Sequence, residues 1–351
     1  VDAAERVPHG GTRDRDVLEF SANVNPERPE GVRAVHERAL DDATRYPDDA
    51  YPNFRDAAAD YVDRATDRGI DREAVVPTPG GLAALRSTFA TTLEPGDCAL
   101  VPAPSFGEYA REVDLQGGRV ERVPHDAVVD LDAAALANAR MVVACNPNNP
   151  TGDAYDHDAL VALAARCRDA GTTLLVDEAF LGFTDEPSLA GEPGVVVARS
   201  LTKLFGLPGL RVGFAVARGR ERDRLGTARR TWNLGGPAAA VGAHCLRDRA
   251  FVAETRDRVA TERDRIRAGL PAGVRAHDDA TDRDGVAPFV LLDVGGCERD
   301  AAGVVAAGRE RGVAVRDATT FRGLDAHVRV AVRTPDENDE LLRVLDEVVE
   351  A

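Results

Sequence analysis

The sequence has almost no lysine: Lys203 is the only one in 351 residues, so 44 basic residues minus one leaves 43 arginines. Arginine can replace lysine in surface charges, ion pairs and phosphate contacts. It cannot form a Schiff base, because its guanidinium stays protonated and delocalised. A lone lysine near a strand end is otherwise a solvated charge, but the lysine-free background favours a chemical role for position 203.

Other absences exclude whole classes of protein. No apolar run approaches the roughly 20 residues needed to cross a bilayer, so we expect no membrane association. Residues 1–11 (VDAAERVPHGG) lack the apolar stretch of a signal peptide, and we expect a cytoplasmic protein. The five cysteines are odd in number and scattered, so we expect neither disulfides nor a zinc site, and no other metal.

The chain also lacks an excess of basic residues, with a formal net charge of −16. Nucleic-acid partners require a basic surface, so we expect none. Acidic excess with almost no lysine is typical of proteins from a salt-loaded, haloarchaeal cytoplasm, where ions screen self-repulsion over short distances. The alternative is an arginine-biased, GC-rich genome without salt adaptation.

Short apolar, β-rich runs alternate with helical patterns between about residues 70 and 215. Strands buried on both faces and joined by helices indicate an α/β fold with a mostly parallel sheet. Ligands in such sheets bind beyond the carboxyl ends of the strands. The predicted strands are 98–103, 140–146, 172–179, 194–200 and 211–217.

A second, smaller α/β unit follows Trp232. A long Arg/Glu-rich helical pattern, roughly 237–269, leads into apolar runs VAPFVLLDV and HVRVAVRT and a closing helix. The first 30 or so residues have no fold of their own and are expected to form an arm that joins this unit. We therefore expect an N-terminal arm (1–35), a large domain (36–235), and a linker helix with a small C-terminal domain (236–351).

Four segments after predicted strands each offer a different chemical group. Residues 145–152 (CNPNNPTG) form a rigid turn with exposed amides, and Asp177 in VDEAF provides a carboxylate. Ser200 and Lys203 follow the next strand, and Arg211 lies eight residues beyond the lysine. Together they supply an amide, a carboxylate, an amine and an anion-binding set.

These groups match the needs of pyridoxal 5′-phosphate (PLP). A lysine can bond the aldehyde, and a carboxylate beside the pyridine nitrogen keeps the ring protonated and able to accept electrons. An asparagine amide can hydrogen-bond the ring O3′. Ser200, Arg211 and the backbone N–H groups of a glycine-rich helix start can hold the phosphate. Asp177 alone could equally be a helix cap or an ion-pair partner; its place in the series favours the cofactor role.

The motifs NPNNPTG, DEAF and SLTKLFGLPGLRVG, in this order and spacing, resemble fold-type-I PLP enzymes of the aminotransferase class I/II superfamily over nearly the whole chain. The resemblance implies a large PLP-binding domain with a smaller α/β domain. It also implies a homodimer, in which Tyr46 reaches the phosphate of the neighbouring subunit's cofactor. Within one chain it implies that Lys203 bonds PLP, Asp177 pairs with the ring nitrogen and Asn149 contacts O3′. It implies that Phe106 stacks on the ring and that Phe180 lies beside it. The residues implied to bind the phosphate are Gly80, Gly81, Ser200 and Arg211.

The sequence departs from the family pattern at the phosphate-binding turn. The turn reads PTPGGLAAL, so Gly80 and Gly81 can offer backbone donors while Leu82 and Ala83 add no side-chain hydrogen bond. Phe106 has an alternative interpretation as a core residue, since most phenylalanines pack in cores.

Two branches of the family act on small phosphorylated amino compounds: threonine-phosphate decarboxylase of cobalamin biosynthesis and histidinol-phosphate aminotransferase of histidine biosynthesis. HGG followed by FSANVNP, PSFGEY, Phe180 in DEAF, and the tail VRDATTFRGLDAHVRVAVRT resemble the decarboxylase. We therefore predict decarboxylation of L-threonine O-3-phosphate to (R)-1-aminopropan-2-ol phosphate, with the aminotransferase as the alternative. A further alternative is a non-catalytic protein of the PLP fold with a binding or regulatory role.

A doubly anionic substrate needs several fixed donors. We expect Arg329 to bind the substrate carboxylate and Arg316 its phosphate, with His9 and Arg322 as further candidates. In an arginine-rich chain, each arginine has an alternative role in a surface ion pair.

Overall fold

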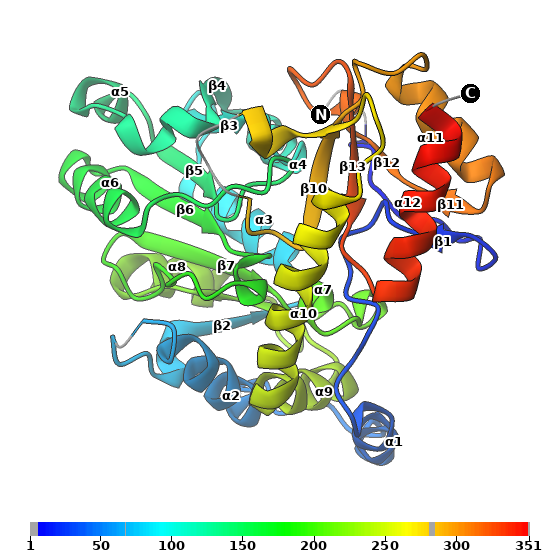
Figure 1. The fold of residues 1–351 in the computed structure, drawn as a ribbon. Helices are drawn as coiled ribbons and strands as arrows, with labels where there is room; N and C mark the ends of the chain where they lie inside the picture. The colour runs from blue at the N-terminus through cyan, green and yellow to red at the C-terminus, as the bar shows by residue number, and fades with distance from the viewer. Residues whose placement is uncertain (1–5, 67, 281–284, 350–351) are drawn as a thin grey trace.

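The computed structural model describes residues 6–66, 68–280 and 285–349. Within them, the largest sheet has seven strands in the order β2-β8-β7-β6-β5-β3-β4 (Figure 1). Strand β8 pairs antiparallel with both β2 and β7, and the other pairings in this sheet are parallel. The strands are β2 (Val75–Thr78), β3 (Cys98–Ala103), β4 (Arg119–Pro124), β5 (Met141–Cys145), β6 (Thr173–Asp177), β7 (Val195–Ser200) and β8 (Gly213–Val216).

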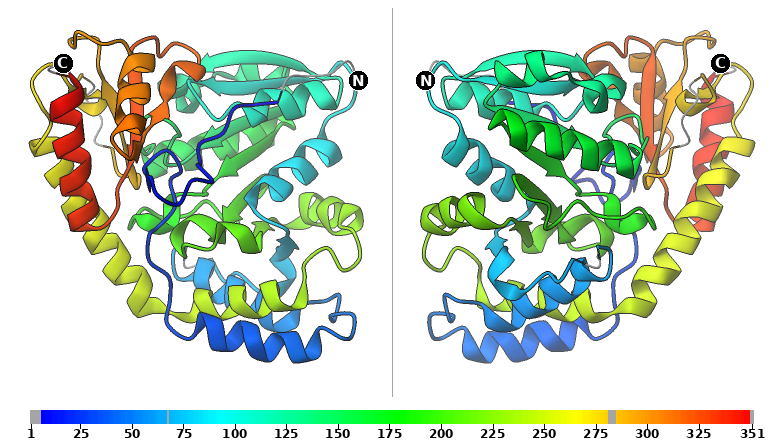
Figure 2. Two further views of the ribbon diagram at one scale, coloured as in Figure 1. Left: turned by 90° about the vertical axis from the view of Figure 1, so that its right-hand side faces the viewer. Right: turned by 90° about the vertical axis from the view of Figure 1, so that its left-hand side faces the viewer.

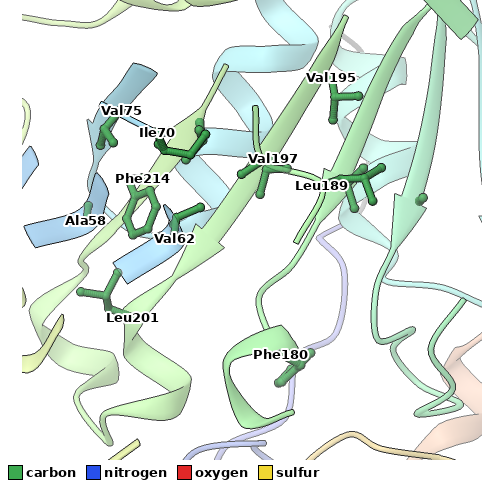
Figure 3. Packing of buried hydrophobic residues seen from close by; sticks show 14 of the residues in the cluster. Ala58, Val62, Ile70, Val75, Phe180, Leu189, Val195, Val197, Leu201 and Phe214 are labelled. Atoms are coloured by element: carbon green, nitrogen blue, oxygen red, sulfur yellow. The ribbon is translucent and has the colours of Figure 1, made fainter. Parts of the chain in front are cut away.

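Helices cover both faces of this sheet, as its apolar strands require. Alternate strand residues join two separate cores: Leu174 and Val176 face one core, whereas Leu175 faces the other. Figure 3 shows part of the first core, where Val62 and Phe214 lie near β7 and Phe180 lies on the turn after β6. Helices of the first core are α2 (Pro52–Asp63), α5 (Ala133–Ala137), α6 (His157–Ala170) and α9 (Gly236–Arg247), and those of the second are α3 (Gly81–Thr92), α4 (Glu108–Leu115) and α8 (Gly219–Ala228).

A second sheet lies beside the first and has the order β12-β13-β10-β9. Its pairings are antiparallel, and its core includes residues of the helices that follow it. Its strands are β9 (Arg275–Ala276), β10 (Phe289–Asp293), β12 (Arg316–Asp317) and β13 (His327–Ala331), accompanied by α11 (Ala301–Glu310) and α12 (Pro335–Val349).

The N-terminal segment crosses between the two units, as the dark blue trace in Figure 2 shows. Strand β1 (Leu18–Glu19) pairs in parallel with β11 (Val313–Ala314), and Phe20 is buried in the core of the second unit. The segment then continues to α1 (Val32–Asp42), which packs on α9. Strand β1 thus connects the N-terminal segment to the second unit. The division into an arm and two domains, with limits at 35 and 235, stays a prediction.

The helical pattern expected over 237–269 is two helices rather than one. Helix α9 ends at Arg247, and α10 (Arg249–Ala268) begins after Asp248, whose carboxylate accepts the backbone N–H of Phe251. An aspartate at this position satisfies an otherwise orphaned amide and starts a new helix. Helix α10 can therefore turn away from α9 toward the second unit (Figure 2). No helix in the described part of the chain is both long and apolar enough to span a membrane.

Candidate active site

A cavity of about 320 Å³ lies at the carboxyl ends of β6 and β7. Its walls come from the N-terminal arm, the large sheet and the second sheet. Among the residues predicted from the sequence, those that line it are His9, Gly81, Phe106, Asn149, Asp177, Phe180, Ser200, Lys203, Arg211, Arg316 and Arg329. Segments far apart in the chain therefore meet in this cavity.

Lys203 lies in the single-turn helix α7 (Leu201–Leu204), directly after β7. Burial lowers the pKa of its amine to about 8, and the nearby positive charges of Arg329 and Arg211 act in the same direction. Among the described residues, no carboxylate forms an ion pair with this amine. The lowered pKa gives this amine a larger neutral fraction near neutral pH than an ordinary lysine has, and the neutral amine is the form that bonds to an aldehyde.

Asp177 ends β6 and is buried. Its Oδ2 accepts a 2.7 Å hydrogen bond from the hydroxyl of Tyr109, and its Oδ1 accepts the backbone N–H of Ala179. Burial raises the pKa of Asp177 to about 6, although the hydrogen bond from Tyr109 opposes the shift. A buried carboxylate without a cationic partner gains from a cationic ring nitrogen placed beside it.

Tyr109 is the residue that sequence reasoning missed. It is fully buried on α4, and its ring makes an edge contact with Phe106 at 5.6 Å between centroids. The signal available was its position three residues after Phe106 in PSFGEY, at the start of a helical pattern. The sequence could not show that its hydroxyl would reach the end of β6.

The predicted phosphate-binding residues form a tight cradle. Gly80 has a positive φ of 94°, and a Cβ there would lie 2.7 Å from Nη2 of Arg211. A Cβ on Gly81 would lie 3.0 Å from the Cβ of Ser200. The Ser200 hydroxyl is also 3.0 Å from that of Thr202. Hydroxyls, a guanidinium and the amino end of α3 therefore converge, and this donor set suits a phosphate dianion.

Asn149 and Arg329 meet across the cavity. The guanidinium of Arg329 donates Nη1 to the side-chain oxygen of Asn149 and Nη2 to the carbonyl of Ser21, while its buried Nε has no partner among the described atoms. Burial lowers the pKa of Arg329 to about 9, with a further contribution from Arg316. Because the amide oxygen of Asn149 accepts from Arg329, its NH₂ group is left to donate to a ring oxygen.

Two aromatic side chains line the region next to Lys203. Phe106 lies 5.7 Å from the ring of His9, and Phe180 makes an edge contact with Phe289 at 5.1 Å. Phe106 lines the cavity and also packs against the second core, so the binding and core interpretations both describe it.

Comparison with known proteins agrees with this geometry. The family model "Aminotransferase class I and II" matches residues 15–345. The chain belongs to this family. It is 34% identical over 362 residues to a histidinol-phosphate aminotransferase of Halobacterium salinarum, covering 95% of this chain and 92% of the relative.

Solved structures show the same fold. The L-threonine-O-3-phosphate decarboxylase of Porphyromonas gingivalis matches with a TM-score of 0.83 at 23% identity, covering 95% of this chain and all of that one. The histidinol-phosphate aminotransferase of Sinorhizobium meliloti, solved with PLP, matches at 0.82 and 22%, covering 95% of this chain and 91% of that one. The chain therefore has the fold type I of aspartate aminotransferase, and as a class I/II family member it uses PLP.

The residues of the cavity fit this cofactor. Lys203 would bond its aldehyde, Asp177 would face its ring nitrogen, and the Gly80–Gly81 cradle with Ser200 and Arg211 would hold its phosphate. PLP supplies an electron sink for a bond broken at the substrate Cα. The protein holds the cofactor and decides which bond is aligned for cleavage.

Three predicted residues do not line this cavity in the single chain: Gly80, which lies next to it in the phosphate cradle, Tyr46 and Arg322. Tyr46 is 78% exposed and stacks on Trp232 at 4.2 Å between ring centroids. Its predicted contact belongs to a neighbouring subunit, so it stays a prediction. Arg322 is exposed and absent from the cavity wall, because the preceding Phe321 points inward instead. Its assignment to the substrate site has no support from the structure.

Proposed function

We propose that this PLP-dependent enzyme removes CO₂ from L-threonine O-3-phosphate and yields (R)-1-aminopropan-2-ol phosphate for cobalamin biosynthesis. The observation that carries the proposal is a pair of arginines without carboxylate partners. Arg316 on β12 and Arg329 on β13 are direct cross-strand neighbours. Each guanidinium carbon lies 5.6 Å from the centroid of the Phe321 ring.

Like charges opposite one another on a sheet destabilise the free protein. Most ion pairs of the described chain join an arginine to an acidic residue, yet neither of these two arginines has such a partner there. Arg316 instead donates to the carbonyl of Pro8 and the hydroxyl of Thr320. Two clustered cations favour a substrate with a carboxylate and a phosphate, whose combined charge offsets their repulsion.

The N-terminal arm supports the same class of substrate. The imidazole of His9 is 3.1 Å from Glu108, and Pro8 is held by Arg316, so the arm contacts both sides of the cavity. This arm excludes water from the substrate. Arg329 then fixes the carboxylate and Arg316 the phosphate.

Apolar walls favour decarboxylation over other reactions at Cα. Phe106 and Phe180 flank the region near Lys203, so Arg329 and not a surrounding shell of water holds the carboxylate there. The carboxylate loses most of its solvent when it enters such a site, and its charge disperses as CO₂ leaves. A proton held on Nζ of Lys203 can then pass to the substrate carbon.

A second candidate is transamination of histidinol phosphate, and the 34% identity to the Halobacterium salinarum protein named for that activity favours it. The same cofactor residues serve both reactions. The difference lies in which Cα bond stands perpendicular to the cofactor ring, and that alignment depends on how the arginines hold the substrate.

One assay separates the two. Purified holoenzyme is supplied with threonine phosphate, and CO₂ release is measured together with the ³¹P resonance of the product. Stoichiometric CO₂ and a new phosphate monoester support the proposal. Turnover of histidinol phosphate with 2-oxoglutarate, without CO₂ from threonine phosphate, would establish the aminotransferase instead.

We also infer a homodimer in which Tyr46 completes the neighbouring site. The exposed Tyr46–Trp232 stack supports this, since paired exposed aromatics favour an interface. Mixing inactive Lys203→Ala subunits with Tyr46→Ala subunits tests it. Recovery of activity in the mixture supports shared sites; no recovery, with dimers present, contradicts them.

A further inference from the structure

A second cavity of about 320 Å³ lies on the other side of β7 from the cofactor cavity. Arg199 lines it, whereas the next residue, Ser200, lines the cofactor cavity. Successive strand residues point to opposite faces, so the two cavities lie back to back across the end of the strand. The remaining walls come from α2, α9, α10 and the turn after β6.

Arginines outnumber carboxylates on the wall of this second cavity, with Arg64, Arg199, Arg249 and Arg256 against Asp185 and Glu186. Arg256 pairs with Asp185 at 2.7 Å. Arg64, directly after α2, and Arg249 on α10 have no ion-pair partner among the described residues, and Arg64 gives its Nε only to the carbonyl of Asp60. Burial lowers the pKa of Arg64, and the positive charge of Arg249 lowers it further. The two guanidinium groups are therefore close enough to repel each other.

Arg199 adds an independent observation. Only 5% of this residue is exposed, and its Nη2 pairs with the buried Glu178 at 2.8 Å. Its Nε is buried and has no hydrogen-bond partner among the described atoms. A buried charged donor left unsatisfied is costly, and such groups are ordinarily paired.

We propose that this second cavity binds a small polyanion of the phosphate class as an effector of the enzyme. Arg64, Arg199 and Arg249 supply the positive charge, and Leu181, Leu246 and Val252 supply an apolar wall for the rest of the ligand. A phosphate placed between Arg64 and Arg249 relieves their repulsion and accepts hydrogen bonds from their free donors. The proposal holds whichever of the two reactions the enzyme performs.

The effector role follows from a short connection between the cavities. A hollow of about 10 Å³ is lined by Tyr61 and Arg199 of the second cavity and by Ser200 of the cofactor cavity. Gly182 lies between Tyr61 and Leu204, the neighbour of Lys203, and its missing side chain leaves room for both. A Cβ there would lie 2.7 Å from the Tyr61 hydroxyl and 2.9 Å from Leu204. A ligand that moves Tyr61 or Arg199 therefore displaces atoms next to Lys203 and Ser200.

Calorimetric titration of the holoenzyme with inorganic pyrophosphate, at fixed KCl, tests this binding site. The double variant Arg64→Gln/Arg249→Gln keeps the cofactor cavity intact and should lose at least about tenfold in affinity for the site. Ala253→Trp, which fills the exposed edge of the cavity without removing charge, should lose binding as well. Arg247→Gln, two residues from Arg249 and outside the cavity, is the matched control and should bind as the wild type does.

If the folded double variant binds pyrophosphate with unchanged heats, the proposed site is wrong. An equal loss of affinity in Arg247→Gln would also contradict it, because the loss would then reflect net charge alone. The visible absorbance of the bound cofactor reports the effector role. We expect pyrophosphate to shift it in the wild type and not in the double variant. A spectrum that stays constant while the site saturates would refute the effector role.

Discussion

Tyr109 donates its hydroxyl to Asp177 across 2.7 Å, from a helix on one face of the sheet to the end of a central strand. The bond holds one carboxylate oxygen while Ala179 holds the other. Asp177 is therefore fixed in place before any cofactor binds, and its charge is stabilised by hydrogen bonds in a buried position.

Removing the Tyr109 hydroxyl should weaken cofactor binding. In Tyr109→Phe the pKa of Asp177 rises above its value of about 6, because a hydrogen bond to the charged form is lost. More of the carboxyl is then neutral at pH 7, and PLP affinity should fall about tenfold. Equilibrium dialysis with PLP measures it. Tyr51→Phe, which removes another buried hydroxyl far from Asp177, should change affinity little.

Lys203 should destabilise the cofactor-free protein at neutral pH. The pKa of its amine falls from 10.5 in the unfolded chain to about 8 in the folded protein. Between pH 8 and pH 10.5 the unfolded chain therefore binds more protons than the folded protein, and the free energy of unfolding rises with pH. Lys203→Met should therefore raise the free energy of unfolding at pH 7 by up to about 3 kcal/mol. Thermal or urea unfolding should show this gain shrinking from pH 8 to 10.5. A gain that is constant with pH would contradict an origin in the buried amine.

Arg316→Gln should raise the KM for threonine phosphate by tenfold or more, because one of two clustered cations is lost. The same change should raise the melting temperature of the substrate-free enzyme slightly, since the repulsion from Arg329 disappears. Arg322→Gln, on the same segment but outside the cavity, should leave both quantities unchanged. Equal effects of the two substitutions would argue against a specific role for Arg316.

The net charge of −16 should make stability depend on salt. Raising KCl from 0.01 M to 1 M shortens the screening length from about 30 Å to about 3 Å and so reduces self-repulsion. We expect both melting temperature and activity to rise over this range. Activity that is highest in dilute buffer and lost in molar KCl would remove the interpretation of salt adaptation and favour a compositional origin of the arginine bias.

The central strands could be predicted closely because they are buried on both faces and therefore apolar throughout. Strand β6, expected within 172–179, spans Thr173–Asp177. Edge strand β4 escaped prediction because its residues RVERVP are largely exposed and carry no apolar run. The break at Asp248 escaped because one aspartate in an arginine-rich helical pattern is as common on a helix surface as at a helix start.

The predicted cofactor residues meet in one cavity because most of them lie at or just beyond the carboxyl end of a strand, and their roles stay predictions. For the second sheet the sequence indicated the segment but not which of its side chains face the cavity. Arg329 and Arg316 line the cavity, whereas Arg322 does not, since a turn between β12 and β13 decides which side chains point inward. Glu178 and Arg199 lie beside predicted residues, yet their pairing on the opposite face depends on strand alternation in three dimensions.

The cavity is lined by residues that lie far apart in the sequence, and this has a consequence for synthesis of the chain. His9 near one end and Arg329 near the other both line it. A ribosome therefore exposes Lys203 and the cofactor cradle after the N-terminal arm but well before Arg316 and Arg329. A chain released before β12 would hold the amine of Lys203 in a site that lacks both arginines. Synthesis of β12 and β13 is therefore the step that adds both arginines to the cavity.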